Sequence, residues 1–113
     1  MDCLFCNIVH GVLPADVVYD ADDMMAFRDN SPQAPTHILI IPKLHIATIN
    51  DVDPQHALLV GRMVLVAQQL AAENQCHQSG YRLVFNVNQH AGQAVFHIHL
   101  HLLGGRQMTW PPG

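Results

Sequence analysis

The feature that most constrains this chain is a strict alternation of histidine and apolar residues between positions 96 and 102. Its three histidines are His97, His99 and His101, each followed by an aliphatic residue. Side chains of an extended strand point alternately to its two faces. The alternation therefore predicts a strand over residues 95–103, with imidazoles on one face and the hydrophobic core on the other.

Three uses of such a histidine face can be compared. A solvated polar face accounts for one or two histidines, but strand propensity does not favour three in strict alternation. A single metal ion cannot bind all three, because the α-carbons of His97 and His101 would lie about 13 Å apart and each His–metal bond is only about 2 Å. A nucleophile at His99 is the third use, since protonated neighbours would disfavour its charged form and keep its Nε2 lone pair available. Those neighbours could also bind phosphate oxygens or protonate a leaving group.

The remaining patterns predict an α+β fold with a five-stranded antiparallel sheet, one long helix and one short helix. The expected short helix covers residues 3–10, the long helix runs from 53 to 73 or 75, and the other strands cover 17–20, 24–28, 36–42 and 81–87. An apolar run from Ile38 to Ile41 indicates a strand buried on both faces. Asp53 and Pro54 are typical of a helix start, and Gly80 marks the turn after the helix.

Length and charge exclude several classes of protein. With 113 residues the chain has room for one domain. Its net charge of −4 gives no basic surface for nucleic acid, and no signal-peptide pattern or run of about 20 apolar residues occurs. Three cysteines argue against a disulfide framework, so we expect a cytoplasmic protein. Only 12% of residues are charged, which favours an oligomer with a covered surface.

The segment from His97 to Leu103 matches the His-φ-His-φ-His-φ-φ signature of the histidine triad (HIT) superfamily, where φ is apolar. Other segments resemble its Hint branch: 29–37, Asn86, Gly92-Gln93, 104–106 and 110–113. A histidine at position 101 differs from the nucleotidyltransferase branch, which has Gln there, and the dinucleoside polyphosphate hydrolase branch lacks the C-terminal extension. The resemblance implies a single HIT domain over residues 1–113 with a tail at 104–113, and a homodimer that extends the sheet.

The resemblance also implies an activity, namely hydrolysis of the P–N bond of purine nucleoside phosphoramidates through a nucleotidyl-histidine intermediate. It makes His99 the nucleophile, His101 a phosphate contact and His37 a proton relay, with His97 completing the catalytic set; no cofactor is needed for this chemistry. The residues that it assigns to an AMP- or GMP-type substrate are Asp29, Asn86, Gly92, Gln93, Phe5, Ile8, Phe27 and Trp110. Of these, Asp29 would accept the ribose hydroxyls, and Trp110 would reach the partner's site.

Cys3 and Cys6 form a short two-cysteine motif, which alone is a weak signal because such pairs can also be redox-active. Certain bacterial members of the superfamily bind structural zinc with such a pair and two histidines. The matching histidines here are His45 and His97, and two Cys with two His make a tetrahedral set of the kind that zinc prefers. The resemblance therefore implies a structural zinc site.

Two other functions stay open. Ala94 stands where many members carry Ser or Thr, which favours a nucleotide-binding interaction protein with weak or vestigial catalysis. A domain whose main role is to bind zinc is the other. Asn30 stands where close relatives carry an apolar residue near the base, so base selectivity stays open too.

Overall fold

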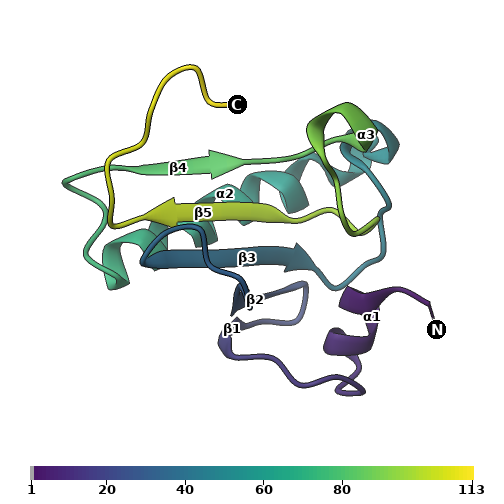
Figure 1. Cartoon of the computed structure of the whole chain (residues 1–113). Coiled ribbons are helices and arrows are strands. Elements are labelled where there is room, and N and C mark those ends of the chain that lie inside the picture. Colours follow the sequence, from purple (N-terminus) through teal and green to yellow (C-terminus); the bar gives the residue numbers. More distant parts are fainter. Residues whose placement is uncertain (1) are drawn as a thin grey trace.

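The computed structural model describes residues 2–113, so the first residue of the predicted domain lies outside the described residues. The chain contains three α-helices and five strands among these residues (Figure 1). In order they are α1 (Leu4–Val9), β1 (Val17–Asp20), β2 (Met24–Arg28), β3 (Thr36–Pro42), α2 (Ala57–Glu73), β4 (Tyr81–Val84), α3 (Asn88–Ala91) and β5 (Leu100–Gly104). All strand pairs are antiparallel, in the order β1-β2-β3-β5-β4. The predicted α+β fold is confirmed.

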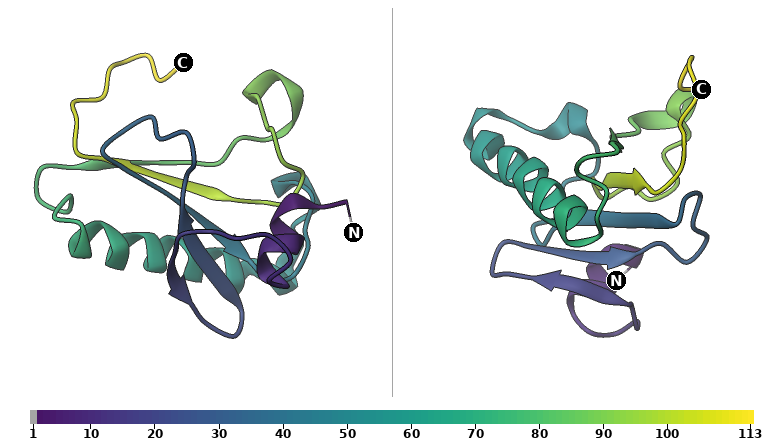
Figure 2. Two further views of the ribbon diagram at one scale, coloured as in Figure 1. Left: turned by 60° about the horizontal axis from the view of Figure 1, so that its bottom comes forward. Right: turned by 90° about the vertical axis from the view of Figure 1, so that its left-hand side faces the viewer.

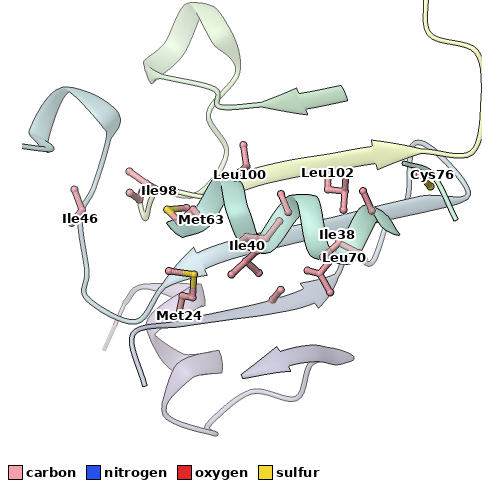
Figure 3. Close-up of a cluster of buried hydrophobic side chains, with 14 residues drawn as sticks. Met24, Ile38, Ile40, Ile46, Met63, Leu70, Cys76, Ile98, Leu100 and Leu102 are labelled. Carbon is pink, nitrogen blue, oxygen red and sulfur yellow. The ribbon is translucent and has the colours of Figure 1, made fainter. Parts of the chain in front are cut away.

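The main core lies between α2 and one face of the sheet (Figures 1 and 2). Met63 and Leu70 of α2 lie over Ile40, Leu100 and Leu102 of the two central strands (Figure 3). All of these side chains are almost inaccessible to water. Burying aliphatic side chains stabilises a fold by about 1.5–3 kcal/mol each, so this layer holds the central strands in place.

The opposite face of the sheet has its own smaller core, covered by α1. Phe5 of α1 packs with Met25, Phe27, Leu39 and Ile41, which alternate with the residues that face α2. Every residue of β3 is buried, which confirms the prediction of a strand covered on both faces. The second core fixes α1 next to the central strands.

The long helix begins close to the predicted position. Asp53 accepts a hydrogen bond from the Gln55 N–H and caps a short 3₁₀ turn, Pro54–His56, that leads directly into α2. Proline at this position loses no helical hydrogen bond, because the first N–H groups of a helix have no partner within it. The predicted cap is therefore confirmed, although the first turn is 3₁₀ rather than α-helical.

Two predicted strands are shorter in the structure. The prediction of a strand starting at residue 95 is wrong, because β5 begins at Leu100; the Ile98 N–H instead donates to the Ile46 carbonyl, outside the sheet. The strand predicted over 81–87 ends at Val84, which pairs with His101 close to the start of β5. Residues 85–87 have no strand opposite them, and the chain turns into α3, which the sequence did not predict.

No helix within residues 2–113 is long and apolar enough to cross a membrane.

Candidate active site

His37, His99 and His101 gather on the sheet face opposite α2. Alternate residues 98, 100 and 102 point into the α2 core, which leaves the histidines on the other face as predicted. The ring centres of His99 and His101 lie 5.0 Å apart, and those of His37 and His101 lie 5.2 Å apart. Antiparallel pairing of β3 with β5, in which Leu39 lies opposite His101, brings His37 to this cluster across 64 residues of sequence.

The backbone fixes which nitrogen of His99 carries the proton. His99 Nδ1 lies 2.8 Å from the carbonyl oxygen of His97. A carbonyl only accepts hydrogen bonds, so neutral His99 is protonated at Nδ1 and keeps a lone pair on Nε2. Phe5 holds the other side of the ring, with the two ring centres 5.1 Å apart in an edge-on arrangement. The residue is thus oriented as a nitrogen nucleophile.

A second chain of hydrogen bonds fixes the proton of His101. The backbone N–H of Gln33 donates to His37 Nδ1 over 3.0 Å, so neutral His37 carries its proton on Nε2. This Nε2 lies 2.9 Å from His101 Nδ1, to which it donates. With Nδ1 accepting, neutral His101 is protonated at Nε2. The site therefore holds one lone pair, on His99, next to one N–H donor, on His101.

Burial keeps these imidazoles neutral. It lowers the pKa of His37 and His99 below the ordinary 6.5. Burial also lowers the pKa of His101, to about 4, and repulsion from His99 and His37 adds to this effect. The sequence predicted that charged neighbours would keep His99 neutral; that prediction is wrong, because removal from water is the main cause.

An apolar pocket of about 430 Å³ opens beside the histidines. Its lining includes the predicted residues Phe5, Ile8, Phe27 and Asp29, together with Leu4, Leu13, Arg28, Asn30, Leu39 and Val95. Asp29 Oδ1 accepts the Ser31 N–H over 2.8 Å, and its Oδ2 lies 3.5 Å from His37 Nε2. The carboxylate thus links the pocket to the histidine cluster.

Trp110 does not line this pocket. Its side chain is 82% exposed, in the C-terminal segment that leaves β5 and passes the end of β4 (Figure 1). Its role at a partner's site stays a prediction.

Gly92 and Gln93, which were predicted to bind the substrate, lie in a tight turn. The N–H groups of Gly92 and Gln93 donate to the carbonyls of Gln89 and Asn88, so in this structure they are not free donors. The Gln93 side chain is buried and joins the turn to residues 47 and 95 through three hydrogen bonds. The next N–H along the chain, that of Ala94, has no acceptor within residues 2–113, and the sequence analysis did not single it out.

Cys3, Cys6, His45 and His97 form a second cluster behind Phe5. Their ligand atoms all lie within 4.8 Å of one another. Cys6 Sγ is 3.3 Å from His45 Nδ1 and 3.5 Å from His97 Nδ1, and the two Nδ1 atoms are 3.2 Å apart. These four residues could bind a metal ion.

The spacing and the hydrogen bonds of this cluster fit a tetrahedral ion. Metal bonds of about 2.0–2.1 Å to nitrogen and 2.3 Å to sulfur give N···N separations of about 3.3 Å and N···S separations of about 3.5 Å. His97 Nε2 donates to the Pro42 carbonyl over 2.7 Å, which leaves its Nδ1 lone pair facing the cysteines. Burial raises the pKa of the Cys6 thiol to about 11, so a bound cation is the means of making it a thiolate ligand.

Comparison with known proteins agrees with the histidine pattern. The family model of the HIT domain matches residues 10–108. The chain belongs to the HIT family. This HIT protein is 50% identical, over 95% of its length, to a purine nucleoside phosphoramidase of Escherichia coli K12, of which it covers 90%.

Solved structures of HIT proteins are similar in fold as well. A HIT family hydrolase from Legionella pneumophila is 59% identical, with a TM-score of 0.98 over 99% of this chain and 100% of that one. A zinc-bound histidine triad family protein from Mycobacterium smegmatis is 35% identical, with a TM-score of 0.83 over 95% of this chain and 77% of that one.

A second group of possible metal ligands in this HIT protein is better explained as a chain of hydrogen bonds. Asp29, His37 and His101 also bring their ligand atoms within 4.8 Å of one another. However, the Gln33 N–H occupies Nδ1 of His37, so its Nε2 carries a proton and offers no lone pair. Both clusters bring their ligand atoms close enough for a metal ion, but the hydrogen bond to His37 argues against a metal ion in this second cluster.

Proposed function

We propose that this HIT protein hydrolyses the P–N bond of purine nucleoside phosphoramidates through a nucleotidyl intermediate on His99. The observation that carries the proposal is the Nε2 lone pair of His99, left free by the hydrogen bond from Nδ1 to the His97 carbonyl. It lies beside an apolar pocket large enough for a base. The activity of the Escherichia coli relative supports the same chemistry.

In the first step, His99 Nε2 attacks the phosphorus atom, a P–N bond forms to the imidazole, and the bond to the leaving amine breaks. The His99 ring becomes positively charged, and the His97 carbonyl that accepts its Nδ1–H stabilises this charge. His101 is neutral, so its Nε2–H donates a hydrogen bond to the leaving nitrogen, which takes its proton from solvent as the bond breaks. His37 donates to His101 Nδ1 and so keeps the His101 proton directed at the reacting group.

In the second step, water attacks the same phosphorus atom and the bond to His99 breaks. One water proton passes to solvent, which balances the proton taken up in the first step; His99 returns to its neutral state, and the nucleoside monophosphate leaves. The two substitutions together consume one water and need no metal ion.

The phosphate contacts come mainly from uncharged donors. Fixed cations are scarce in the chain, which has five Lys and Arg residues in all, and Arg28 is the one that lines the pocket. We assign the phosphate oxygens to the Asn86 amide, the Ala94 N–H and His101, because the Gly92 and Gln93 N–H groups are used within their turn. Phe5, Ile8 and Phe27 enclose the base.

The test is to incubate the purified protein with adenosine 5′-phosphoramidate and follow release of AMP. Turnover supports the proposal. Binding of AMP without turnover would support the alternative, a nucleotide-binding protein with vestigial catalysis.

Asp29 is expected to bind the ribose diol, because it lines the pocket and its carboxylate lies 3.5 Å from His37 Nε2. Asp29→Asn keeps an oxygen for the Ser31 N–H but removes the charge. We expect KM for adenosine phosphoramidate to rise about 5- to 30-fold, the effect of weakening one or two hydrogen bonds, while KM for a 2′,3′-dideoxy substrate stays unchanged. The control is Asp22→Ala, in the exposed β1–β2 turn. Equal KM values for both substrates in the unmodified protein would contradict the assignment.

Zinc is the metal that we assign to Cys3, Cys6, His45 and His97. Two thiolates and two imidazoles satisfy a closed tetrahedral zinc site, and the zinc-bound Mycobacterium smegmatis relative supports this choice. Bound there, the ion would supply folding energy by joining α1 to the segments before and after the central strands, since no coordination position is left for chemistry.

We further propose a homodimer formed at the free edge of β4 and the outer face of α2. Edge strands expose unpaired backbone groups that pair readily with another chain. Leu58 and Leu65 on α2 are 85% and 61% exposed. In this arrangement the exposed Trp110 would contribute to the partner's site.

Light scattering during gel filtration is expected to give twice the chain mass for the unmodified protein, and a single chain mass for Leu65→Arg. Val12→Arg, an equally exposed apolar position on the loop after α1, should leave the dimer intact. A monomeric unmodified protein would refute the arrangement.

A further inference from the structure

Arg106 holds the loop that contains Gln33, and this loop orients His37. It lies just beyond β5, and its Nε donates to the Gln33 carbonyl over 2.8 Å. The N–H of the same residue, Gln33, donates to His37 Nδ1 over 3.0 Å. A continuous series of hydrogen bonds thus runs from an exposed arginine through Gln33 and His37 to His101.

Further hydrogen bonds hold the loop that contains Gln33. Asp29 Oδ1 accepts the Ser31 N–H, the Ser31 carbonyl accepts Gln33 Nε2, and the Asp29 N–H donates to the His37 carbonyl. Together with the Gln33 N–H to His37, these contacts make a ring of hydrogen bonds between the pocket carboxylate and the proton relay. Arg106 is the contact that ties this ring to the segment after β5.

Gly105 allows the arginine to reach the loop. It has a φ of +91°, a conformation that side-chain-bearing residues rarely adopt, and a Cβ placed there would lie 2.9 Å from Pro35. The backbone after β5 can therefore lie directly against the Pro35 side of the loop. Arg106 follows at the position where its guanidinium meets the Gln33 carbonyl.

We propose that Arg106 is a positioning residue that fixes the tautomer of His37 through the backbone of Gln33, and thereby presents the His101 Nε2–H to the substrate. This inference rests on the proposed function for its effect on turnover, but the tautomer itself can be measured without substrate. Loss of Arg106 frees the Gln33 carbonyl, the Gln33 N–H leaves His37 Nδ1, and the His37 proton is no longer confined to Nε2. His101 then loses the donor at its Nδ1.

The test measures histidine tautomers and kinetics in Arg106→Ala, Arg106→Lys and Arg82→Ala. Arg82 is the matched control, because its guanidinium also donates to a backbone carbonyl of the C-terminal segment, that of Thr109, over 3.0 Å, but lies outside the loop. Two-bond ¹H–¹⁵N spectra of the full-length protein report which ring nitrogen of His37 and His101 is protonated.

In the unmodified protein and in Arg82→Ala, we expect an unprotonated His37 Nδ1 and a protonated Nε2. In Arg106→Ala, the two His37 nitrogen shifts should move toward each other, and kcat should fall about 5- to 30-fold, the effect of losing one hydrogen bond, with KM within about twofold. Arg106→Lys, which retains a donor, should recover part of both changes.

Unchanged His37 shifts in Arg106→Ala would overturn the proposal, as would identical changes in Arg82→Ala. An unmodified protein with the expected tautomers and no turnover would refute the proposed function but not the positioning role of Arg106.

Discussion

Turnover of adenosine phosphoramidate is expected to fall by at least about 10⁴-fold in His99→Ala, the order of loss seen when a covalent nucleophile is removed. Neither of the other two histidines of the cluster can replace it as a nitrogen nucleophile, because His37 and His101 both carry their proton on Nε2. Affinity for AMP should stay within several-fold of that of the unmodified protein, since the apolar pocket is retained. AMP release and AMP binding, measured on the same preparation, check both expectations.

Two further variants separate the roles of the histidines. His101→Ala should lower kcat by about 10²–10³-fold, the usual cost of removing one hydrogen-bond donor to the transition state, and the loss should shrink for substrates whose leaving amine is more acidic. His90→Ala, an exposed histidine in α3, should have no effect. Turnover by His99→Ala at a tenth or more of the original rate would rule out His99 as the nucleophile.

Removal of the metal is expected to have the largest effect on stability. Purified protein should contain one zinc ion per chain, and chelation or Cys6→Ser should lower the melting temperature by about 10 °C or more, because metal binding energy at a structural site is folding energy. Cys3 caps α1 and Cys6 lies within it, so the helix that carries Phe5 should loosen and AMP should bind more weakly. Elemental analysis, thermal melting and AMP titration measure the three effects.

The control for this prediction is Cys76→Ala. Cys76 is also buried, but it packs against Gly104 at the far end of β5 and belongs to the α2 core. Its replacement should change stability without changing the zinc content or the response to chelation. Protein that holds no zinc, with a melting temperature insensitive to chelators, would contradict the assignment.

The metal site also bears on His99 itself. His97 would bind the ion through Nδ1, and its carbonyl accepts the His99 Nδ1–H. Loss of the metal should therefore lower kcat, in addition to weakening nucleotide binding.

The face on which each histidine lies could be predicted from sequence, because alternation along an extended chain depends only on local geometry. Sequence reasoning also located the strand buried on both faces, from a continuous apolar run, and the start of α2, from Asp53 and Pro54. It missed the start of β5 at Leu100, since that boundary depends on a hydrogen bond from Ile98 to the distant Ile46 carbonyl. Once β5 is shortened, β4 has nothing to pair with beyond Val84.

The protonation pattern of the site could not be predicted in this way. It depends on two backbone groups, the His97 carbonyl and the Gln33 N–H. Every residue type has such groups, so the amino-acid sequence does not show which of them meet a histidine. The resemblance to the family assigned His37 a role but not the group that orients it. Likewise, the engagement of the Gly92 N–H within its own turn follows from the formation of α3, which the sequence did not indicate.

The central claim is that His99 becomes covalently nucleotidylated, and a rapid-quench experiment tests it most directly. The protein is mixed with excess adenosine phosphoramidate, stopped with alkali within milliseconds to preserve phosphorus–nitrogen bonds, digested and analysed by mass spectrometry. The account predicts an adenylyl group on His99 that disappears as the substrate is consumed. Turnover with no adduct at any time point, or an adduct on another residue, would contradict it.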